Sequence, residues 1–416
     1  MIINYIMCCS ILKWIAEGTD RMHVLAVIPC SIYGSSGDSV NERQLLEALS
    51  RKFDRVIVLS MVPLNTHKKY VKSVPSNIVL INLPYPPYFG YPFMLFYSFV
   101  TLLFGYLLDK LQGLNFIYVR GTMLGFGLML SHKLRAKTTV KFGGFIEDEL
   151  TLKGITLVLV KKVASTIDKI VLSKCAKIAA NNALWVKEIL TKRGVSRPLK
   201  EYVFLPPGIN LSKISRLINK ITPNKKEYSY KVGFIGTLVW WQGVDILVRA
   251  IRIVQNKINN IELLIIGDGP LRAYIENLAK ALDVNLKITG YLPHEKALEV
   301  FSTVDILVLP SYKMSSTELN IPIKVIEAWA LGIPVIVTPK RVFLDKFRDG
   351  IDVIYAEPTP KAIANKIILL LSNTKLKGRL SKNGRLLAKK FDYDIIVDNL
   401  VSNISTTHVK VCENTT

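Results

Sequence analysis

Short apolar runs alternate with longer amphipathic segments along most of this chain. The apolar runs have the length of buried strands, and the segments between them repeat hydrophobic residues at helical spacing. Strands that alternate with helices predict a parallel sheet with helices on both faces. In the first half, the predicted strands are residues 24–28, 55–59, 79–83, 116–119, 139–142, 177–180 and 202–205. The predicted helices there include residues 40–52, 121–134 and 184–193.

A polar, lysine-rich stretch interrupts this alternation after Pro206-Pro207-Gly208, which is typical of a linker. A second alternation then predicts strands 232–235, 262–266, 286–289, 306–309 and 335–337, and helices 243–257, 271–282, 295–301, 322–331 and 360–371. A helical stretch over 376–402 breaks near Phe391. We therefore predict an α/β protein with two doubly wound parallel sheets: an extension 1–21, a first domain 22–208, a linker 209–229, a second domain 230–390, and a terminal helix and tail 391–416.

The composition supports large folded cores and anionic partners. Half of the 416 residues are hydrophobic, so the chain can bury two or three domains. Lys plus Arg number 55 against 32 acids, a formal charge of +23, which favours lipid surfaces, phosphorylated substrates or nucleic acid. The basic residues come in pairs rather than in long runs, and zinc-finger spacing is absent. We therefore expect no nucleic acid partner.

Cysteine usage and the N-terminus indicate an intracellular setting. The five cysteines form no CxxC pair, which favours reduced thiols and a cytoplasmic location. Lys13 and Glu17 interrupt the apolar start and no small-residue cleavage site follows, so we expect no secretory signal. Either Met1 or Met22 is the start of translation.

Residues 92–108 are almost wholly apolar. Their length is at the lower limit for a membrane-spanning helix. A helix lying in one leaflet, or a core helix with one apolar face exposed, fits the same residues. Together with the positive charge, this segment predicts a peripheral protein on an anionic, cytoplasmic membrane face.

The segment after the predicted strand 306–309 has the pattern of a phosphate site. A polar loop leads to Pro322, which suits the first turn of a helix, and Gly332 ends that helix. A helix N-terminus that follows a strand presents free N–H groups and a positive dipole to anions. Lys324 adds a cation in the first turn, against the dipole preference, so an anionic ligand explains it better than helix stability. Glu327 lies on the same face, one turn further along.

This segment resembles the donor-site motif of retaining glycosyltransferases of the GT-B fold, the glycosyltransferase family 4 or group 1 type. The residues from Glu327 to Val335 closely match the family's Glu-Ala-Met-Ala-x-Gly-x-Pro-Val, with Trp329 in place of the Met, and Pro322-x-Lys324-x-x-Glu327 matches one subgroup. In this sequence Leu319 occupies the strict family position of the first Glu, and Glu318 stands one residue before it. The resemblance implies that Glu327 binds the donor ribose, Lys324 the diphosphate and Glu318 the sugar hydroxyls, which are the predicted catalytic residues.

Further loops resemble the family's donor site. Thr237 and Gln242 stand where the family carries an Arg and a Lys that neutralise the diphosphate, so both charges are missing here. Plain strand-to-helix turns fit the same loops. His294 is interpreted as a helix-start residue. The predicted donor-binding residues are Gly236, Thr237, Gln242, Gly267, Gly269, Tyr291, Leu292, Ile323, Lys324 and Glu327.

Acceptor binding is predicted in the first domain. A glycine-rich loop after the first strand resembles the family's acceptor loop, Arg120 ends a strand, and three acids follow the strand 139–142. A mobile surface loop, a surface arginine and favourable acids at a helix start are the alternatives. The His or Arg that the family often places near Gly143 is missing. The predicted acceptor-binding residues are Gly34, Ser35, Ser36, Gly37, Arg120, Glu147, Asp148 and Glu149.

The resemblance implies a glycosyltransferase that moves a sugar from a UDP- or GDP-sugar to a glycan or lipid-linked acceptor, with retention of configuration. No cofactor is expected beyond the nucleotide sugar, and five histidines suggest no metal cluster. Two alternatives share the fold, a catalytically silent subunit that binds a partner enzyme and a sugar-nucleotide epimerase.

Overall fold

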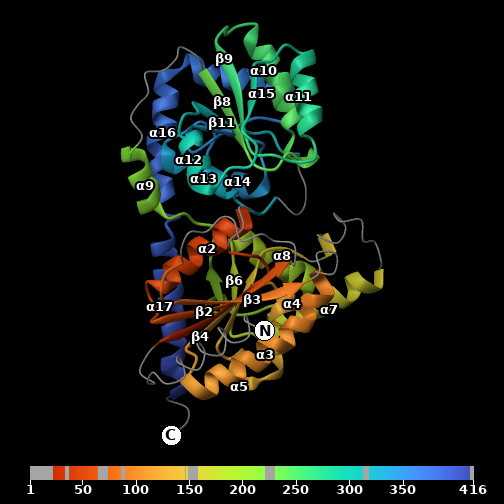
Figure 1. Ribbon diagram of the computed structural model, residues 1–416, viewed down its shortest axis with the longest axis vertical. Helices are drawn as coiled ribbons and strands as arrows, with labels where there is room; N and C mark the ends of the chain where they lie inside the picture. The colour runs from red at the N-terminus through yellow and green to blue at the C-terminus, as the bar shows by residue number, and fades with distance from the viewer. Residues whose placement is uncertain are drawn as a thin grey trace, which may run out of the picture. The chain divides into compact units, whose positions relative to one another are not determined.

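Two parallel sheets organise this computed structural model, one in each of two units (Figure 1). Unit 1 comprises Met1–Leu205 and Val397–Thr416, and unit 2 comprises Pro206–Ile396. The structure describes residues 22–32, 37–63, 74–85, 90–145, 147–148, 158–220, 230–312 and 318–412.

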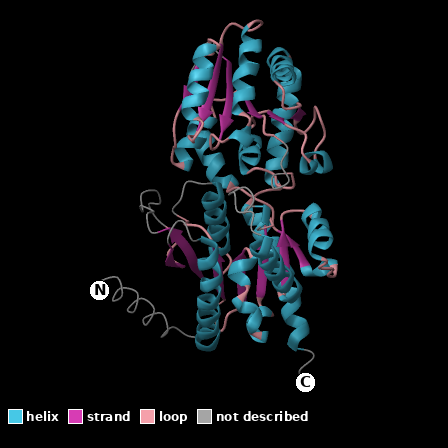
Figure 2. Cartoon of the chain, turned by 90° about the vertical axis from the view of Figure 1, so that its right-hand side faces the viewer, coloured by secondary structure: helices cyan, strands magenta, loops and turns pink. Residues whose placement is uncertain are grey.

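Unit 1 is built on a seven-stranded parallel sheet with the strand order β3-β2-β1-β4-β5-β6-β7. The six residues of β1 are all buried, because β2 and β4 pair with its two edges and helices cover the faces of the sheet (Figure 2). The strands are β1 (His23–Ile28), β2 (Arg55–Pro63), β3 (Ile78–Tyr85), β4 (Phe116–Arg120), β5 (Thr138–Phe142), β6 (Lys177–Ala180) and β7 (Tyr202–Phe204).

Helical segments connect these strands, and one of them is unusually apolar. They are α2 (Gly37–Ser50), α3 (Gly90–Gln112), α4 (Thr122–Gly125), η1 (Gly127–Leu130), α5 (His132–Arg135), α7 (Val158–Lys174), α8 (Ala183–Arg193) and η2 (Leu199–Glu201). By length and composition alone, Phe93–Gln112 of α3 is apolar enough to cross a membrane, and 33% of its most apolar stretch is buried in the fold.

The single helix predicted over residues 121–134 is wrong, because α4, η1 and α5 replace it. The chain there packs backbone against backbone on α3: a Cβ on Gly127 would lie 2.1 Å from the carbonyl oxygen of Ser98. Ser131 then begins a new turn by accepting a hydrogen bond from the Leu134 N–H. Close packing on a neighbour, which periodicity does not reveal, breaks the helix.

Unit 2 holds a six-stranded parallel sheet in the order β10-β9-β8-β11-β12-β13. Its strands are β8 (Tyr230–Ile235), β9 (Ile261–Ile266), β10 (Leu286–Ile288), β11 (Ile306–Leu309), β12 (Val335–Val337) and β13 (Ile354–Tyr355). Its helices are α9 (Leu211–Lys220), η3 (Trp240–Gln242), α10 (Val244–Gln255), α11 (Arg272–Ala281), α12 (His294–Phe301), α13 (Ile323–Leu331), α14 (Arg341–Lys346), α15 (Pro360–Ser372) and α16 (Thr374–Lys389). The predicted class, two doubly wound parallel sheets, is confirmed.

Part of the predicted linker 209–229 is a helix. Asn210 accepts a hydrogen bond from the Lys213 N–H and so caps α9, whose Ile214 is buried. α9 packs against α13 of unit 2. Leu211, Ile214, Leu217 and Ile218 do repeat at helical spacing, so the sequence held a signal for this short amphipathic helix that the linker prediction overlooked.

The chain returns to unit 1 through its terminal helix, as predicted. α16 ends before residues 390–392, and α17 (Tyr393–Cys412) follows. The break is fixed by Ile209, whose N–H and carbonyl bond the Phe391 carbonyl and the Tyr393 N–H, each at 2.9 Å. From Val397 onward the helix belongs to unit 1, where Asp398 contacts Lys52 at 2.5 Å.

Candidate active site

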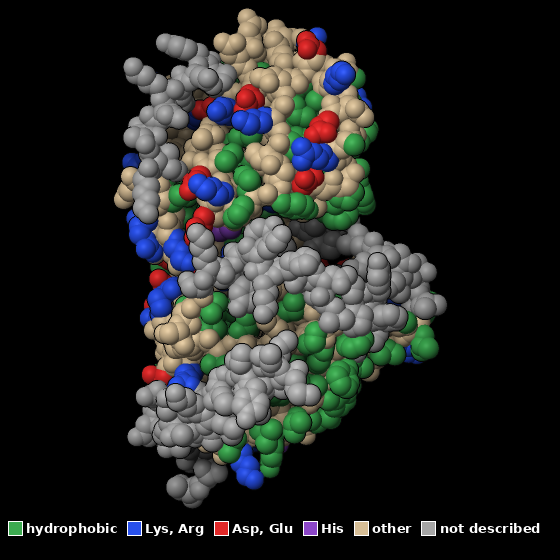
Figure 3. Space-filling view, viewed as in Figure 1, with side chains coloured by type: hydrophobic (Ala, Val, Ile, Leu, Met, Phe, Trp, Pro, Cys, Tyr) green, Lys and Arg blue, Asp and Glu red, His purple; other side chains and the backbone are tan. Residues whose placement is uncertain are grey.

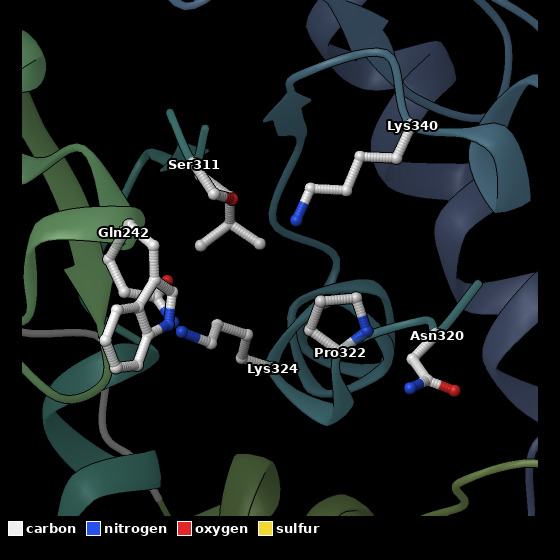
Figure 4. A pocket seen from close by; sticks show the side chains of 8 residues that line it. Gln242, Ser311, Asn320, Pro322, Lys324 and Lys340 are labelled. Atoms are coloured by element: carbon white, nitrogen blue, oxygen red, sulfur yellow. The ribbon is translucent and has the colours of Figure 1, made fainter. Parts of the chain in front are cut away.

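A pocket in unit 2 opens where the sheet changes its direction of winding. From β8 the chain continues to β9 and β10 on one side, whereas β11 leads to β12 and β13 on the other. The loops after β8 and β11 therefore diverge, and ligands bind at such switch points in doubly wound sheets. The cavity measures about 210 Å³. It is lined by Trp241, Gln242, Leu309, Ser311, Asn320, Pro322, Lys324 and Lys340 (Figure 4).

Glycines bring the loops beneath this pocket into backbone contact. Gly236 and Gly267 have φ angles of 146° and 141°, which L side chains rarely adopt. A Cβ on Gly236 would lie 2.5 Å from Nζ of Lys324, and a Cβ on Gly267 would lie 2.1 Å from the Gly236 carbonyl oxygen. A Cβ on Gly269 would meet the Leu238 backbone at 2.6 Å. Gly236, Gly267 and Gly269, all predicted donor-binding residues, thus allow the loops next to Lys324 to pack closely.

Lys324 extends from the first turn of α13 into the pocket (Figure 4). Pro322 precedes the helix and no side chain caps its N-terminus. The Lys324 amino group lies 4.9 Å from the centre of the Phe234 ring. Removal of this amino group from water, with repulsion from Lys340, lowers the pKa of Lys324 to about 8.

Lys340 is a second cation in the same pocket, and sequence analysis missed it. It follows β12 and precedes α14, its side chain is buried, and its amino group points into the cavity (Figure 4). Burial lowers its pKa to about 8, although the nearby Glu318 opposes this shift. Its place just after a strand's carboxyl end was the available signal.

Glu327 is buried on α13 and contacts a histidine. Its Oε1 lies 2.6 Å from Nε2 of His294, the first residue of α12. His294 therefore occupies the expected helix start, and its ring also holds the carboxylate that the motif singled out.

Glu318 lies beside the pocket rather than in its lining. Its Oε2 accepts a hydrogen bond from the Arg341 N–H at 3.0 Å, and its carbonyl accepts one from the Val342 N–H at 2.9 Å. Oε1 is buried without a hydrogen bond. The structure thus anchors Glu318 to the start of α14, next to Lys340.

The other predicted donor residues surround the pocket unevenly. Gln242 lines it, whereas Thr237 and Tyr291 are exposed, and Leu292 and Ile323 are partly buried. Trp241, which sequence analysis did not single out, also lines the pocket and belongs to an aromatic cluster. The Trp240 ring lies 5.8 Å from Trp241 and 6.3 Å from Tyr312, centre to centre.

In unit 1, Arg120 lies at the carboxyl end of β4, beside the switch point between β1 and β4. It bonds Asp38 at 2.6 Å and lies 3.1 Å from Glu42. The guanidinium holds the pKa of Asp38 below its usual value. Buried Lys141 lies 3.7 Å from Glu42. The charge of Arg120, a predicted acceptor-binding residue, is therefore already compensated by two acids of α2.

The remaining acceptor predictions divide into paired residues and residues outside the described part. Nη2 of Arg193 lies 2.6 Å from both carboxylate oxygens of Glu147, and Arg193 also bonds buried Asp168. Asp148 lies 3.7 Å from Lys192. Gly37 begins α2. Gly34, Ser35, Ser36 and Glu149 lie outside the described residues. In the described ranges, no group of three or more His, Cys, Asp and Glu side chains is arranged to hold a metal.

Comparison with known proteins relates this pocket to a known family. Residues 216–387 match the family model described as glycosyl transferases group 1. This part of the chain is similar to that family. It contains the pocket, both lysines and the His294–Glu327 pair.

Relatives and solved structures extend the likeness. A curated relative from Campylobacter jejuni, N,N'-diacetylbacillosaminyl-diphospho-undecaprenol alpha-1,3-N-acetylgalactosaminyltransferase, is 27% identical over 47% of this chain and 54% of its own. The chain spans about half the length of most of the first curated relatives it matches.

Among solved structures, sucrose-phosphate synthase from Thermosynechococcus elongatus superposes with a TM-score of 0.67 at 19% identity, covering 94% of this chain and all of its own. HepE of Anabaena, solved in complex with UDP, gives 0.65 at 14% identity over 92% of this chain and 100% of its own. At such identities the likeness shows the fold, which is GT-B as the resemblance implied.

Proposed function

We propose that this protein is a glycosyltransferase that moves a sugar from a nucleoside-diphosphate sugar to an acceptor hydroxyl with retention of configuration. The observation that carries the proposal is the switch-point pocket, where Lys324 and an uncapped helix N-terminus meet one turn before buried Glu327. Such a site suits a diphosphate joined to a polar nucleoside. The family match over residues 216–387 supports the same activity.

Each of the three predicted catalytic residues has a role in this reaction. Lys324 and the start of α13 bind the diphosphate, Glu327 binds the ribose, and Glu318 contacts hydroxyls of the sugar. The bond from the anomeric carbon to the diphosphate oxygen breaks, and a bond to the acceptor oxygen forms. The acceptor proton passes to the departing diphosphate oxygen, so no side-chain base is required. Cations at the diphosphate stabilise the charge that develops there, without a metal ion.

We further propose that the acceptor is lipid-linked and that α3 lies against an anionic, cytoplasmic membrane face. On α3, the polar residues Ser98 and Thr101 are fully buried, whereas Phe96, Phe99 and Leu103 are about half exposed. Figure 3 shows hydrophobic side chains gathered on one side of this unit. Exposed Tyr106, Leu107 and Leu111 on α3, Leu130 on η1, and Val158, Leu159 and Val163 on α7 belong to the same apolar surface.

The elements that carry this apolar surface pack together, since η1 contacts both α3 and α7. Exposed lysines stand on the same elements or next to them, including Lys110, Lys133, Lys162 and Lys169, and would meet acidic head groups. The name of the Campylobacter jejuni relative includes an undecaprenol-linked diphospho-sugar, which supports a lipid-linked acceptor here.

A nucleotide-sugar screen by thermal shift tests the donor site. We expect a UDP- or GDP-sugar to raise the unfolding temperature of the wild type and of Lys346→Met, whose lysine is exposed on α14. Lys324→Met removes the first-turn cation and should abolish the shift. A wild type that responds to none of these donors contradicts the proposal. Binding without transfer to any acceptor would instead fit a catalytically silent subunit.

A further inference from the structure

We infer that Lys340 and Lys324 act as a pair that holds the donor diphosphate, which rests on the proposed function of this pocket as the donor site. The two lysines come from different loops of the sheet, Lys324 from the start of α13 and Lys340 from the segment after β12. Both side chains line one cavity; in Figure 4 the Lys340 amino group extends into its middle and the Lys324 amino group lies beside Gln242. Two ammonium groups in one cavity suit the two phosphates of one ligand.

Among the described residues, the two acids that act on the lysines lie outside the cavity lining. Glu327 acts on Lys324 and contacts His294, and Glu318 acts on Lys340 and accepts the Arg341 N–H through Oε2. Glu327 and Glu318 do not line the cavity, and its remaining polar lining is neutral: Gln242, Ser311 and Asn320. Two lysines that repel each other in a partly buried space are stabilised when an anion lies between them.

The pair also accounts for two departures from the resembling family. Thr237 and Gln242 carry no charge where that family has an Arg and a Lys. Gly236, which follows β8, leaves room for the Lys324 amino group where a Cβ would stand, so the lysine occupies the space above that loop. Lys340 lies in none of the motifs that matched the family, and it supplies the second charge to the cavity.

Proton uptake is the consequence that distinguishes the pair from a single cation. Each lysine has a pKa of about 8 in the free protein. A bound diphosphate favours the charged forms and raises both pKa values, so binding above pH 8 draws protons from solution. The affinity therefore falls as pH rises from 7 to 9, by about tenfold for each lysine that titrates.

The test is titration calorimetry with UDP and GDP on the full-length protein, at pH 8.5, in buffers of different ionisation enthalpy. For the nucleotide that binds, we expect uptake of about 0.7 proton per lysine in the wild type. Lys340→Met should more than halve the uptake, because Lys324 then titrates at higher pH without its neighbour's repulsion. It should also weaken binding at pH 7 by about tenfold or more. Uridine and guanosine, which lack phosphates, should show no uptake.

Lys346→Met is the matched control, since Lys346 is exposed on the helix that follows Lys340. It should keep the wild-type uptake and pH profile. Removing the buried charge of Lys340 is not expected to unfold the protein. Circular dichroism checks this, and Lys340→Gln gives a second neutral variant.

Unchanged affinity and proton uptake in both Lys340 variants would overturn the pair. If Lys324→Met still weakens binding in that case, the proposed donor site stands without it. If the wild type binds neither UDP nor GDP, the pair and the proposed function both fail.

Discussion

Glu327 combines burial with a direct contact to a titratable ring, 2.6 Å from His294. A buried carboxylate that loses such a partner turns toward other hydrogen-bond donors. We therefore regard His294 as a positioning residue that aims Glu327 at the donor ribose. Neither residue needs to touch the reacting bond for this role.

Replacing His294 tests that role. In His294→Ala we expect the KM for the nucleotide sugar to rise about tenfold, with a smaller change in kcat, because donor binding rather than chemistry is affected. His294→Gln retains a hydrogen-bond donor and should recover part of the loss. Initial rates against donor concentration measure both constants. Equal KM values in the wild type and both variants would show that His294 does not position Glu327 for donor binding.

Gly236 provides a second residue-scale prediction. Gly236→Ala forces an L side chain to a φ of 146° and places a Cβ 2.5 Å from Nζ of Lys324. We expect a loss of about 1–3 kcal/mol in unfolding free energy and loss of nucleotide binding. Gly378→Ala is the control, since no atom lies within 4 Å of its Cβ position in α16, and it should stabilise by about 0.5–1 kcal/mol. Urea unfolding compares them, and similar losses in both variants would contradict the account.

At the scale of elements, α13 was predictable because several signals agree within a few residues. Pro322 precedes the helix, Gly332 ends it with a φ of 75°, and buried strands flank it. The helix predicted over 121–134 failed because packing against Ser98 breaks it, a contact distant in sequence. Lys340 was missed for a similar reason. Only the fold brings the end of β12 beside the start of α13.

The exposed apolar face of α3 leads to a prediction at the scale of elements. Ser98 and Thr101 donate hydrogen bonds to carbonyls of their own helix, so these two buried hydroxyls are satisfied, while the apolar outer face remains exposed. We expect the protein to sediment with phosphatidylglycerol vesicles. The double variant Phe96→Ser/Leu103→Ser should reduce that partition at least about tenfold, since each buried side chain contributes about 1.5–3 kcal/mol.

Its control is Leu344→Ser/Leu386→Ser, which removes two leucines of similar exposure from unit 2. This control should bind vesicles as the wild type does. Added salt should weaken binding, because exposed lysines contribute attraction that ions screen. Wild-type-like binding by the α3 variant, or no binding by the wild type, would contradict membrane docking through α3.

At the scale of the whole molecule, the sequence pattern predicted both sheets and the returning helix. Strand and helix periods repeat in each half, and the break before Tyr393 coincides with residues that bond Ile209. The environment of the acceptor-binding residues was harder to predict from the sequence. Arg120 ends β4 and Glu147 lies beyond the end of β5, and their pairing with Asp38 and Arg193 depends on contacts that no local pattern encodes.

Removing metal ions tests a prediction about the proposed sugar transfer. Because Lys324 and Lys340 supply positive charge at the proposed diphosphate site, we expect transfer to continue in excess EDTA at close to its initial rate. Rates measured before and after chelation, and after added Mg²⁺ or Mn²⁺, check this. Loss of activity with EDTA and recovery with Mg²⁺ would contradict charge neutralisation by lysines alone.

Transfer of a labelled sugar from a UDP- or GDP-sugar to lipid-linked acceptors, by wild type and Glu327→Ala, tests the central claim most directly. The account predicts turnover by the wild type, a product with the anomeric configuration of the donor by NMR, and a loss of at least about a hundredfold in kcat/KM for Glu327→Ala. Transfer that survives Glu327→Ala, or a wild type that binds donor and never transfers the sugar, would contradict it.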